Sequence, residues 1–518
     1  MEKLRKLLIQ LIWLFACFLF SAIAFFIFIN SNHYLKVAKF KLPIVFLFLF
    51  LVVTFIVILI HCLNNYKYTT VIIVWIVGLF ILQVIIAKFG HTRIGWDVFT
   101  IIEQANDLKE EWNLYFAYFP NNRMLTYLLM LLFNLTKSLG ITNIWLVAIM
   151  ANILIIDITL IFVVLLSNKY YGKKGAIISM VLSTFLFALH PNILVPYSDT
   201  FGMCFSVISI FCIERFKQEK TAMKYVWLFF ASFSFIFGFY IKPVILIPLI
   251  AIIIVFFLKE RISLHRKLFL PSLACIAVIT TSIFFADAIR SNAQTAVFTN
   301  PEVYYKEFLK TKEIPLHFYF AMGLNEQKSD DGKYLYGSYN ADDYTIISAI
   351  NGYEEKVVFS VKHAQYRLKN MGFLGYLQHS FHKFIWTNTD GTFLYGFEGS
   401  FHHDSPRSTE GISGFIHEFT YPTSYIYQNY YSNYLQAVWL LIIILCTIAS
   451  YPKGNDDKAL IETLSILGLM LFLVLFETRA RYLFIFTPLY VILATKGLLR
   501  FFKFLEDKEL QAKIFNKL

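Results

Sequence analysis

The sequence predicts an all-α polytopic membrane protein. Of its 518 residues, 58% are hydrophobic and only 15% are charged, and the mean hydropathy is +0.61. A soluble domain of this length carries far more charge. Apolar runs long enough to cross a bilayer recur along the chain, so we expect about 12 transmembrane helices. Their expected positions are residues 7–29, 42–61, 70–88, 143–166, 174–190, 200–213, 224–241, 243–258, 268–287, 434–450, 459–476 and 481–497.

The first apolar run is too long for the core of a signal peptide, and no small-residue cleavage site follows it. We therefore expect a retained first span with the N-terminus inside. The net charge of +12 lies largely in short loops between apolar runs, which is the positive-inside pattern and gives no support for nucleic-acid binding. With this orientation the basic groups expected inside are Lys169, Lys173 and Lys174; Arg215, Lys217, Lys220 and Lys224; Lys259, Arg261, Arg266 and Lys267; Lys453 and Lys458; and Arg500, Lys503 and Lys508. The loop 30–41, with Lys36, Lys39 and Lys41, is the exception.

This topology requires that Met124–Ser138 does not cross the membrane. The segment is short, and Asn121, Asn122 and Arg123 precede it. It is typical of a juxtamembrane helix lying on the outer face. If it crossed, every later loop would change sides and the basic clusters would fall outside.

These boundaries divide the chain into four parts. Residues 1–69 hold two N-terminal spans, and residues 70–287 form a transmembrane core with an outer loop at 89–142. Residues 288–433 are long enough for a small extracytoplasmic domain of mixed structure. Residues 434–518 hold the last spans and an inside tail. We expect a multi-pass protein of the cell membrane, and the heavy use of Ile, Phe, Lys, Asn and Tyr is typical of an AT-rich bacterial genome.

All six cysteines lie in or at the ends of apolar runs, without a Cys-x-x-Cys pair, so we interpret them as buried thiols. The adjacent His402 and His403 and the pair His417-Glu418 lack metal-ligand spacing and favour solvated loops. Asp390 and Glu398 stand in glycine-flanked turns that either approach a sugar or are purely structural. The tyrosine-rich stretch 415–434 fits an interfacial aromatic belt or an acceptor groove.

Asp97 is the most informative single residue. It follows an apolar run and opens a polar stretch, and a carboxylate in such surroundings is by default a functional candidate. The alternative is a solvated acid that only marks the end of a helix.

Other charged residues are expected on the same face as Asp97. Glu103 lies in the same loop, Asp199 ends the turn that begins at His190, and Lys242 precedes Pro243. The last outer turn is Glu477-Thr-Arg-Ala-Arg-Tyr482. Acids beside cations suit a reaction in which a hydroxyl loses its proton while a sugar leaves a phosphate.

The order of these elements resembles the GT-C superfamily of membrane glycosyltransferases, in particular its aminoarabinose transferase and protein O-mannosyltransferase branches. The matching features are an Asp after a span (Asp97), a proline-introduced surface helix, His190-Pro191 leading to Asp199, Gly238-x-x-x-Lys242-Pro243, and Arg479-x-Arg481-Tyr482. The likeness covers residues 70–287 well and 434–497 loosely.

The resemblance implies roles for these positions. Asp97 would be the catalytic acid that acts on the acceptor, and Asp199 a supporting carboxylate. Lys242, Arg479 and Arg481, with Tyr482 beside them, would hold the donor phosphate. Tyr118-Phe-Pro-Asn-Asn-Arg123 departs from the family pattern: it has one proline rather than a pair, and it lacks the lysine that some members place just before it. Arg123 is the candidate to substitute for that lysine. Two extra spans precede the one that leads to Asp97.

Each of these residues also has a purely structural interpretation. Glu477 and Arg481 are four apart and would pair on a helix. Lys242 could extend to lipid headgroups, and Asp199 could cap the following helix.

The resemblance implies a glycosyltransferase that uses a polyprenyl-phosphate sugar and acts on a cell-envelope glycan, polymer or lipid. A Wzy-like polysaccharide polymerase or ligase is a second reading, and a transporter or flippase is a third. The charges gather at one face and the halves do not match, which disfavours the transporter. The sequence neither requires nor excludes a divalent metal near Asp97 and Glu103, and no phosphate-binding glycine loop supports a nucleotide-sugar donor.

Overall fold

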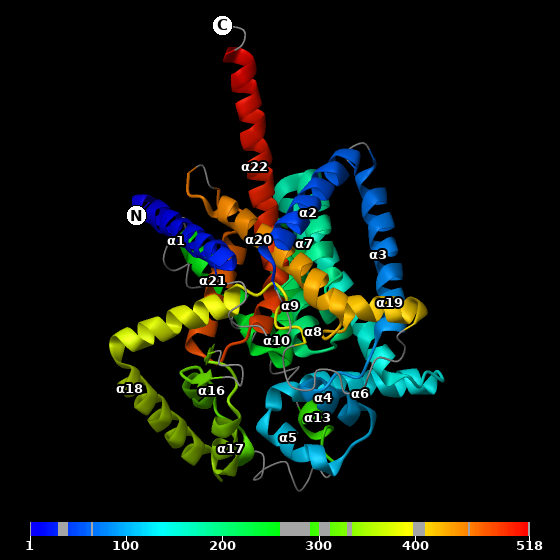
Figure 1. Cartoon of the computed structure of the whole chain (residues 1–518), viewed down its shortest axis with the longest axis vertical. Coiled ribbons are helices and arrows are strands. Elements are labelled where there is room, and N and C mark those ends of the chain that lie inside the picture. The colour runs from blue at the N-terminus through cyan, green and yellow to red at the C-terminus, as the bar shows by residue number, and fades with distance from the viewer. Residues whose placement is uncertain are drawn as a thin grey trace.

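The computed structural model describes residues 2–29, 40–63, 66–259, 291–299, 311–328, 334–396, 410–453 and 456–515. Within these ranges the protein is almost entirely helical, which confirms the expected all-α polytopic class. Many of the shorter helices gather at the end opposite the C-terminus (Figure 1).

The membrane helices follow the expected apolar runs. They are α1 (Glu2–Ile29), α2 (Leu42–Leu63), α3 (Tyr68–Gly90), α7 (Ile144–Ser183) with the π-helical turn η3 (Thr184–Ala188), α9 (Met203–Gln218), α10 (Met223–Ile241), η5 (Pro243–Ile245) with α11 (Leu246–Lys259), η7 (Tyr427–Tyr431) with α20 (Ser432–Ser450), α21 (Leu460–Leu475), and η8 (Ala480–Phe486) with α22 (Thr487–Phe515). Seven described helical stretches are long and apolar enough to cross a membrane, and two shorter apolar helices, Pro243–Leu258 and Leu460–Leu475, accompany them. The helix α9, at the expected span 200–213, is in neither group, so that span stays a prediction. The expected span near 268–287 and Cys275 lie outside the described residues.

The 45-residue stretch Ile144–Ala188 is two antiparallel helices rather than one. Gly172 interrupts it with φ +70°, a conformation that glycine adopts without steric cost. The amide of Asn152 donates to the carbonyls of Asn192, Ile193 and Val195, so the chain after Gly172 returns to the level at which it started. This agrees with the two separate spans expected at 143–166 and 174–190.

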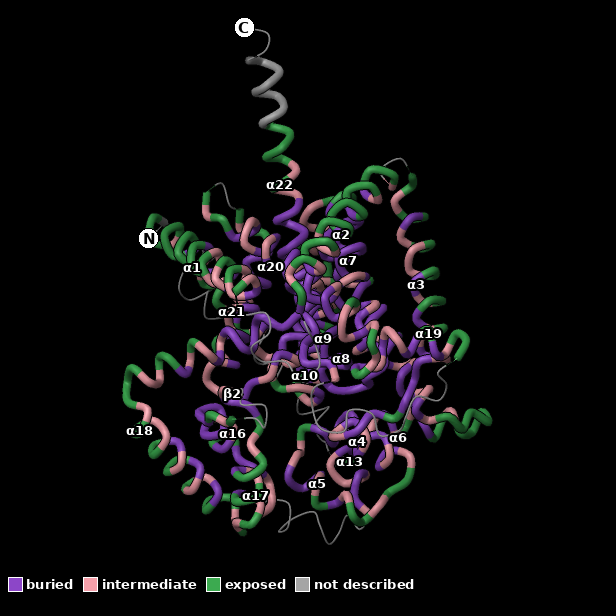
Figure 2. The backbone as a smooth tube through the Cα atoms, in the orientation of Figure 1, coloured by how far each residue is buried: buried purple, intermediate pink, exposed green. Residues whose placement is uncertain are grey.

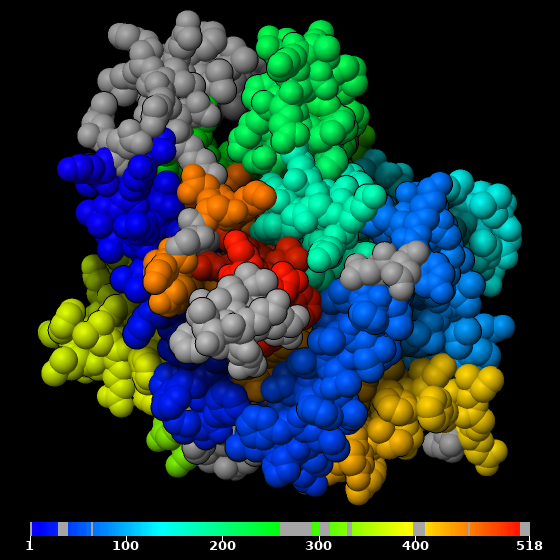
Figure 3. Space-filling model, turned by 90° about the horizontal axis from the view of Figure 1, so that it is seen from above, coloured from blue at the N-terminus to red at the C-terminus, as the bar shows by residue number. Residues whose placement is uncertain are grey.

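The core of the bundle is formed by α20, α22 and α7, with α22 packed against both of the others. Figure 2 shows α20 and the first part of α22 almost wholly buried, whereas α1, α2 and α3 alternate buried and exposed positions. Seen from the C-terminal end, α1, α2 and α3 lie at the periphery (Figure 3). Most of their exposed side chains are apolar, for example Phe18, Phe50 and Val74, as lipid-facing positions require.

The basic groups expected inside at 169–174, 453–458 and 500–503 lie together at the C-terminal end of the bundle, whereas Arg261, Arg266 and Lys267 lie outside the described residues. Lys458 donates to the Tyr170 carbonyl at 2.7 Å, and Arg500 donates to the Lys453 carbonyl at 2.7 Å. Lys496 pairs with Asp456 at 2.7 Å. The basic loops are therefore brought together at one end.

The opposite end carries the helices between the spans. The first group is α4 (Trp96–Asn106), η1 (Glu110–Trp112), α5 (Asn113–Tyr118), η2 (Pro120–Asn122) and α6 (Arg123–Ser138). The helix expected on the surface is α6, which lies across the direction of α3 (Figure 1) and is not among the helices able to span. The turns η4 (Pro191–Leu194) and α8 (Ser198–Phe201) lie near them.

The segment 288–433 contributes several separate pieces at this end. They are α13 (Ser291–Thr295), α16 (Leu316–Met322), the strands β1 (Glu326–Lys328) and β2 (Tyr334–Tyr336), α17 (Ala341–Ala349), α18 (Tyr353–Asn388) and α19 (Gly411–Thr420). The strands pair antiparallel with Gln327 opposite Leu335. α13 packs on α6, α19 on α3, and α18 on α21 and η8, so these pieces dock onto the membrane helices at different places.

Candidate functional site

Asp97 lies in the first turn of α4, immediately after the strained residue Trp96. The segment between α3 and α4 is extended, and Trp96 has φ +49°, which is rare for a bulky side chain. Backbone strain of this kind persists only where the surroundings hold it in place, and it is common at functional sites. The carboxylate of Asp97 is also placed at a helix N-terminus, where the helix dipole favours negative charge.

Two tyrosine hydroxyls fix the Asp97 carboxylate. Tyr115 of α5 donates to Oδ1 at 2.8 Å, and Tyr197, which precedes α8, donates to Oδ2 at 2.9 Å. Burial, and secondarily the negative charge of Asp97, raises the pKa of both phenols. Both hydroxyls therefore keep their protons and act as donors to Asp97.

Arg481 is the cation nearest to Asp97. Its Nη2 lies 4.0 Å from Oδ2 of Asp97, and its guanidinium lies 4.7 Å from the ring centroid of Trp96 and 5.2 Å from that of Tyr197. Such contacts with aromatic faces are favourable for a cation with little water around it. The planar group is thus held beside the acid by two aromatic rings.

A second acid–cation pair stands next to the first. Lys242, between α10 and η5, forms an ion pair with Asp199 of α8, and both side chains are largely buried. The ammonium lies 4.8 Å from the Tyr482 ring centroid and 5.7 Å from that of Tyr197. Burial lowers the pKa of Lys242, while the carboxylate of Asp199 opposes that shift. Lys242 therefore points inward to Asp199 rather than to lipid headgroups. Asp199 in turn binds a cation and does not cap α8, because the N-cap residue of that helix is Tyr197.

A third pair, formed by Glu477 and Arg479, borders the site. Nε of Arg479 lies 3.3 Å from Oε1 of Glu477, and the Tyr482 hydroxyl donates a hydrogen bond to the same oxygen at 3.2 Å. Arg479 is extended (φ −153°, ψ 145°), so no helical turn joins Glu477 to Arg481. The pairing of Glu477 with Arg481, one of the two sequence interpretations, is thus replaced by Glu477 with Arg479, and Arg481 faces Asp97 instead.

These side chains surround a cavity of about 1070 Å³. One wall comes from α4, α5 and η2, and another from α16, residues 338–344 and Trp386 of α18. The bundle side is formed by the start of η5, the end of α21 and residues 477–482. Its lining includes Asp97, Lys242, Arg479, Arg481 and Tyr482, and aromatic side chains make up much of the rest: Trp96, Trp112, Tyr115, Tyr197, Tyr319, Tyr339 and Tyr344. This volume is at the upper end of the roughly 300–1,000 Å³ typical of small-molecule sites.

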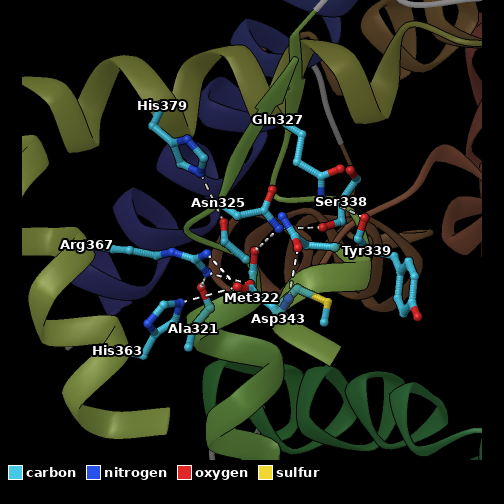
Figure 4. Close-up of polar contacts among 12 residues, drawn as sticks. Ala321, Met322, Asn325, Gln327, Ser338, Tyr339, Asp343, His363, Arg367 and His379 are labelled. Atoms are coloured by element: carbon cyan, nitrogen blue, oxygen red, sulfur yellow. Dashed lines mark hydrogen bonds and ion pairs between the residues drawn. The ribbon is translucent and has the colours of Figure 1, made fainter. Parts of the chain in front are cut away.

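The wall opposite α4 is held by polar contacts among α16, the hairpin, α17 and α18 (Figure 4). Arg367 binds both oxygens of Asp343, at 2.8 and 2.9 Å, and also donates to the Ala321 carbonyl at 2.8 Å. The Asn325 amide donates to the Ser338 carbonyl at 2.6 Å, next to the cavity residue Tyr339. A two-pronged Arg–carboxylate contact is directional, so this wall is well fixed relative to α18.

Glu103 and Arg123 are not brought to this cavity. Glu103, further along α4 than Asp97, accepts a hydrogen bond from the Trp145 indole at 3.1 Å and does not line the cavity. Arg123 is buried, donates to the Phe116 carbonyl at 2.8 Å and lies 5.5 Å from the Phe298 ring centroid. The first contact joins α4 to α7, and the second joins α6 to α5.

Sequence reasoning did not single out the residues that fix Asp97. Tyr197 lies within the motif that ends at Asp199, and Tyr115 lies between Asp97 and the surface helix, but tyrosines are common in this chain. Only the fold shows that these two hydroxyls point at one carboxylate. The tyrosine-rich stretch 415–434 mostly packs within the protein: Tyr427 is fully buried and Tyr431 donates to the Leu189 carbonyl.

The other motifs from the sequence are structural where they are described. Asp390 accepts hydrogen bonds from the amides of Thr392 and Leu394 and so closes a turn. Glu398 and the Phe401–Asp404 stretch lie outside the described residues. Among the residues that are described, no group of three or more His, Cys, Asp or Glu side chains is placed to hold a metal ion.

The fold and the cavity define the class as an all-α polytopic membrane protein with an acid–cation site at the end opposite its C-terminus. Residues 2–499 match the family model described as conserved hypothetical integral membrane protein, and the chain belongs to that family. No curated protein matches the chain significantly.

Among solved structures, the chain is similar to the archaeal oligosaccharyltransferase AglB from Archaeoglobus fulgidus, solved in complex with an inhibitory peptide and a dolichol-phosphate. The identity is 11% and the TM-score 0.37, over 86% of this chain and 52% of that one. The chain therefore spans about half the length of that protein.

Proposed function

We propose that this protein is a membrane glycosyltransferase. It transfers a sugar from a polyprenyl-phosphate donor to a glycan, polymer or lipid of the cell envelope, on the extracytoplasmic face. The single observation that carries the proposal is that Asp97 and Arg481 face each other across 4.0 Å at the edge of a large cavity between the membrane helices and the outer pieces.

The chemistry needs an acid–base group and a cation close together. An acceptor hydroxyl attacks the anomeric carbon of the donor, a new C–O bond forms, and the bond from that carbon to the phosphate oxygen breaks. Asp97 accepts the proton of the hydroxyl, because it lines the cavity beside Arg481 and both of its oxygens are oriented by tyrosine hydroxyls. Glu477, on the same side of the cavity as Arg481, is instead paired with Arg479. The polyprenyl phosphate leaves with the electron pair.

The cations supply the second requirement. Arg481 and Lys242 lie on the bundle side of the cavity, where a lipid-anchored phosphate arrives from the bilayer, and they stabilise the charge that the leaving phosphate gains. A guanidinium matches a phosphate with two parallel donors, which favours Arg481 for direct contact. Arg479 and Tyr482 border the same side, and the aromatic walls suit the apolar faces of a sugar ring.

The side of the membrane follows from charge. The basic groups at 169–174, 453–458 and 500–503 gather at the C-terminal end and the cavity lies at the other, so the positive-inside pattern supports an extracytoplasmic position for the cavity. A nucleotide sugar is confined to the cytoplasm, so a lipid-linked donor suits this position.

The proposal is tested by Asp97→Asn, with Glu103→Gln as the matched control on the same helix. Each variant is purified, reconstituted and assayed for transfer from radiolabelled polyprenyl-phosphate sugars to cell-envelope acceptors. General acid–base catalysis contributes roughly 100- to 10,000-fold, so Asp97→Asn should lose at least about 100-fold in turnover. Glu103→Gln should retain most of it because Glu103 only contacts Trp145. Near-normal turnover of Asp97→Asn would remove Asp97 from the reaction.

The same assay addresses the other two functions. A polymerase or ligase would use only pyrophosphate-linked oligosaccharides and leave monosaccharide donors untouched. A flippase would move a lipid-linked glycan across sealed vesicles without forming a covalent product.

A further inference from the structure

The helix α18 contains an elbow whose outward face is apolar. Gly372 breaks the helix with φ +63°, so Tyr353–Met371 and Phe373–Asn388 run in different directions, as the V shape in Figure 1 shows. Just after the break stand Phe373 and Leu374, with 75% and 78% of their surface exposed. Among the residues that the structure describes, these are the most exposed large hydrophobic side chains.

The apolar residues continue along one face of the second half of α18. Phe373, Leu374, Leu377 and Phe381 are all exposed and recur at spacings of three and four residues, which places them in one stripe of the helix. An exposed stripe of this kind is unusual on a protein surface in water.

The opposite face of the same helix is polar and buried. Lys383 is completely buried and donates to the carbonyls of Gly323 and Phe476, and His379 contacts the Gly323 carbonyl at 3.0 Å. A helix on a water-exposed surface would place its lysine outward and its phenylalanines inward. The second half of α18 does the reverse, which is the arrangement expected for a helix whose outward neighbour is lipid.

The position of the stripe joins it to the membrane surface of the bundle. Phe381, at its end, makes an edge contact with Phe26 of α1, with ring centroids 5.3 Å apart. Phe26 lies in the last turns of a candidate span, where Phe25 and Ile29 are exposed. The apolar surface of α1 therefore continues onto α18.

We propose that the elbow of α18, residues Met371–Leu377 together with Phe381, inserts into the bilayer leaflet that surrounds the C-terminal end of α1 and contacts phospholipid directly. An interfacial helix of this kind buries its apolar face about 5–10 Å into the boundary between headgroups and acyl chains. The elbow would fix the height of α16–α18 above the membrane. The proposal does not depend on the function of the cavity.

A photo-cross-linking amino acid placed at position 374 tests the proposal in the full-length protein in its native membrane. Phe18, an exposed residue in the middle of α1, is the position that must contact lipid, and Ile346, exposed on α17, is the position that should not. After irradiation, mass spectrometry of the purified protein identifies the captured partner. We expect phospholipid adducts at 374 at a yield close to that at 18 and several-fold above that at 346.

Other captured partners would overturn the proposal. Cross-linking of position 374 to a second copy of the chain or to another protein would show that the stripe is a protein interface. A yield of lipid adduct no higher than at 346, while position 18 is labelled, would show that the elbow lies in water. Position 374 is on the surface, so we expect the substituted protein to fold normally. Thermal unfolding of the substituted and unsubstituted proteins is compared to check this.

Discussion

The hydroxyl of Tyr197 donates a hydrogen bond to Oδ2 of Asp97 at 2.9 Å, although the two residues are 100 positions apart in the chain. Tyr115 donates to the other oxygen, so the carboxylate is oriented by two protonated phenols. The same Tyr197 ring contacts both Lys242 and Arg481. Tyr197 is therefore the residue through which the acid and both cations are positioned.

Removing the two hydroxyls should lower turnover without unfolding the protein. Tyr115→Phe and Tyr197→Phe each delete one hydrogen bond to a charged acceptor, worth about 1.5–3 kcal/mol, so we expect roughly a tenfold loss or more in each single variant. Transfer kinetics and thermal unfolding would be measured together. If turnover fell only in proportion to the amount of folded protein, the two hydroxyls would have no role in orienting Asp97 for the reaction.

Breaking the buried pair of Lys242 and Asp199 should destabilise the protein more than removing it whole. Lys242→Met or Asp199→Leu leaves one buried charge without its partner, which costs about 3–5 kcal/mol, whereas the double variant replaces the pair with apolar groups of similar size. We expect the midpoint of thermal unfolding to fall in each single variant and to recover substantially in the double variant. Additive losses would mean that the two side chains do not interact.

The double variant also separates stability from activity. It should fold but transfer poorly if Lys242 stabilises the leaving phosphate, because the cation is then absent from the cavity. Recovery of both folding and turnover would restrict Lys242 to a structural role.

Lys383 should give the protein a pH-dependent stability. Burial lowers its pKa to about 7 from a usual 10.5, with the charge of Glu477 opposing the shift. Between these two values the unfolded chain binds a proton that the folded chain does not, so the free energy of unfolding contributed by this group rises with pH. Below about pH 7 Lys383 is protonated in both the folded and the unfolded chain, so the folded protein bears the full free-energy cost of burying its charge.

The measurement is the difference in unfolding midpoint between the native protein and Lys383→Met. That difference should increase in favour of the native protein as the pH is raised from about 7 towards 10.5. A difference that is constant with pH would show that Lys383 keeps its charge when buried.

Two exposed positions report the orientation in the membrane. In a Cys62→Ser background, cysteine at Glu111, near the cavity, should react with an impermeant maleimide in intact cells. Cysteine at Lys220, in the loop between α9 and α10, should react only after permeabilisation. The reverse pattern would place the cavity in the cytoplasm and remove the basis for a lipid-linked donor.

The sequence predicted the fold class and almost all of the described spans because hydropathy over twenty residues is a local property. It also located the loops that carry Asp97, Asp199, Lys242, Arg479 and Arg481, since these stand where apolar runs end. It could not select among the charges near them. Glu103 and Arg123 have the same chemistry as the cavity residues, yet they contact Trp145, Phe116 and Phe298 instead.

By itself, then, the sequence determined that this chain is a helical membrane protein and which end of its helices carries the unusual charges. Tertiary structure decided which charges meet: Asp97 with Tyr115, Tyr197 and Arg481, and Glu477 with Arg479 rather than Arg481. The physical reason is that span formation depends on the average polarity of a segment. The pairing of side chains depends instead on where separate helices end relative to one another, and on local backbone angles such as those of Trp96 and Arg479.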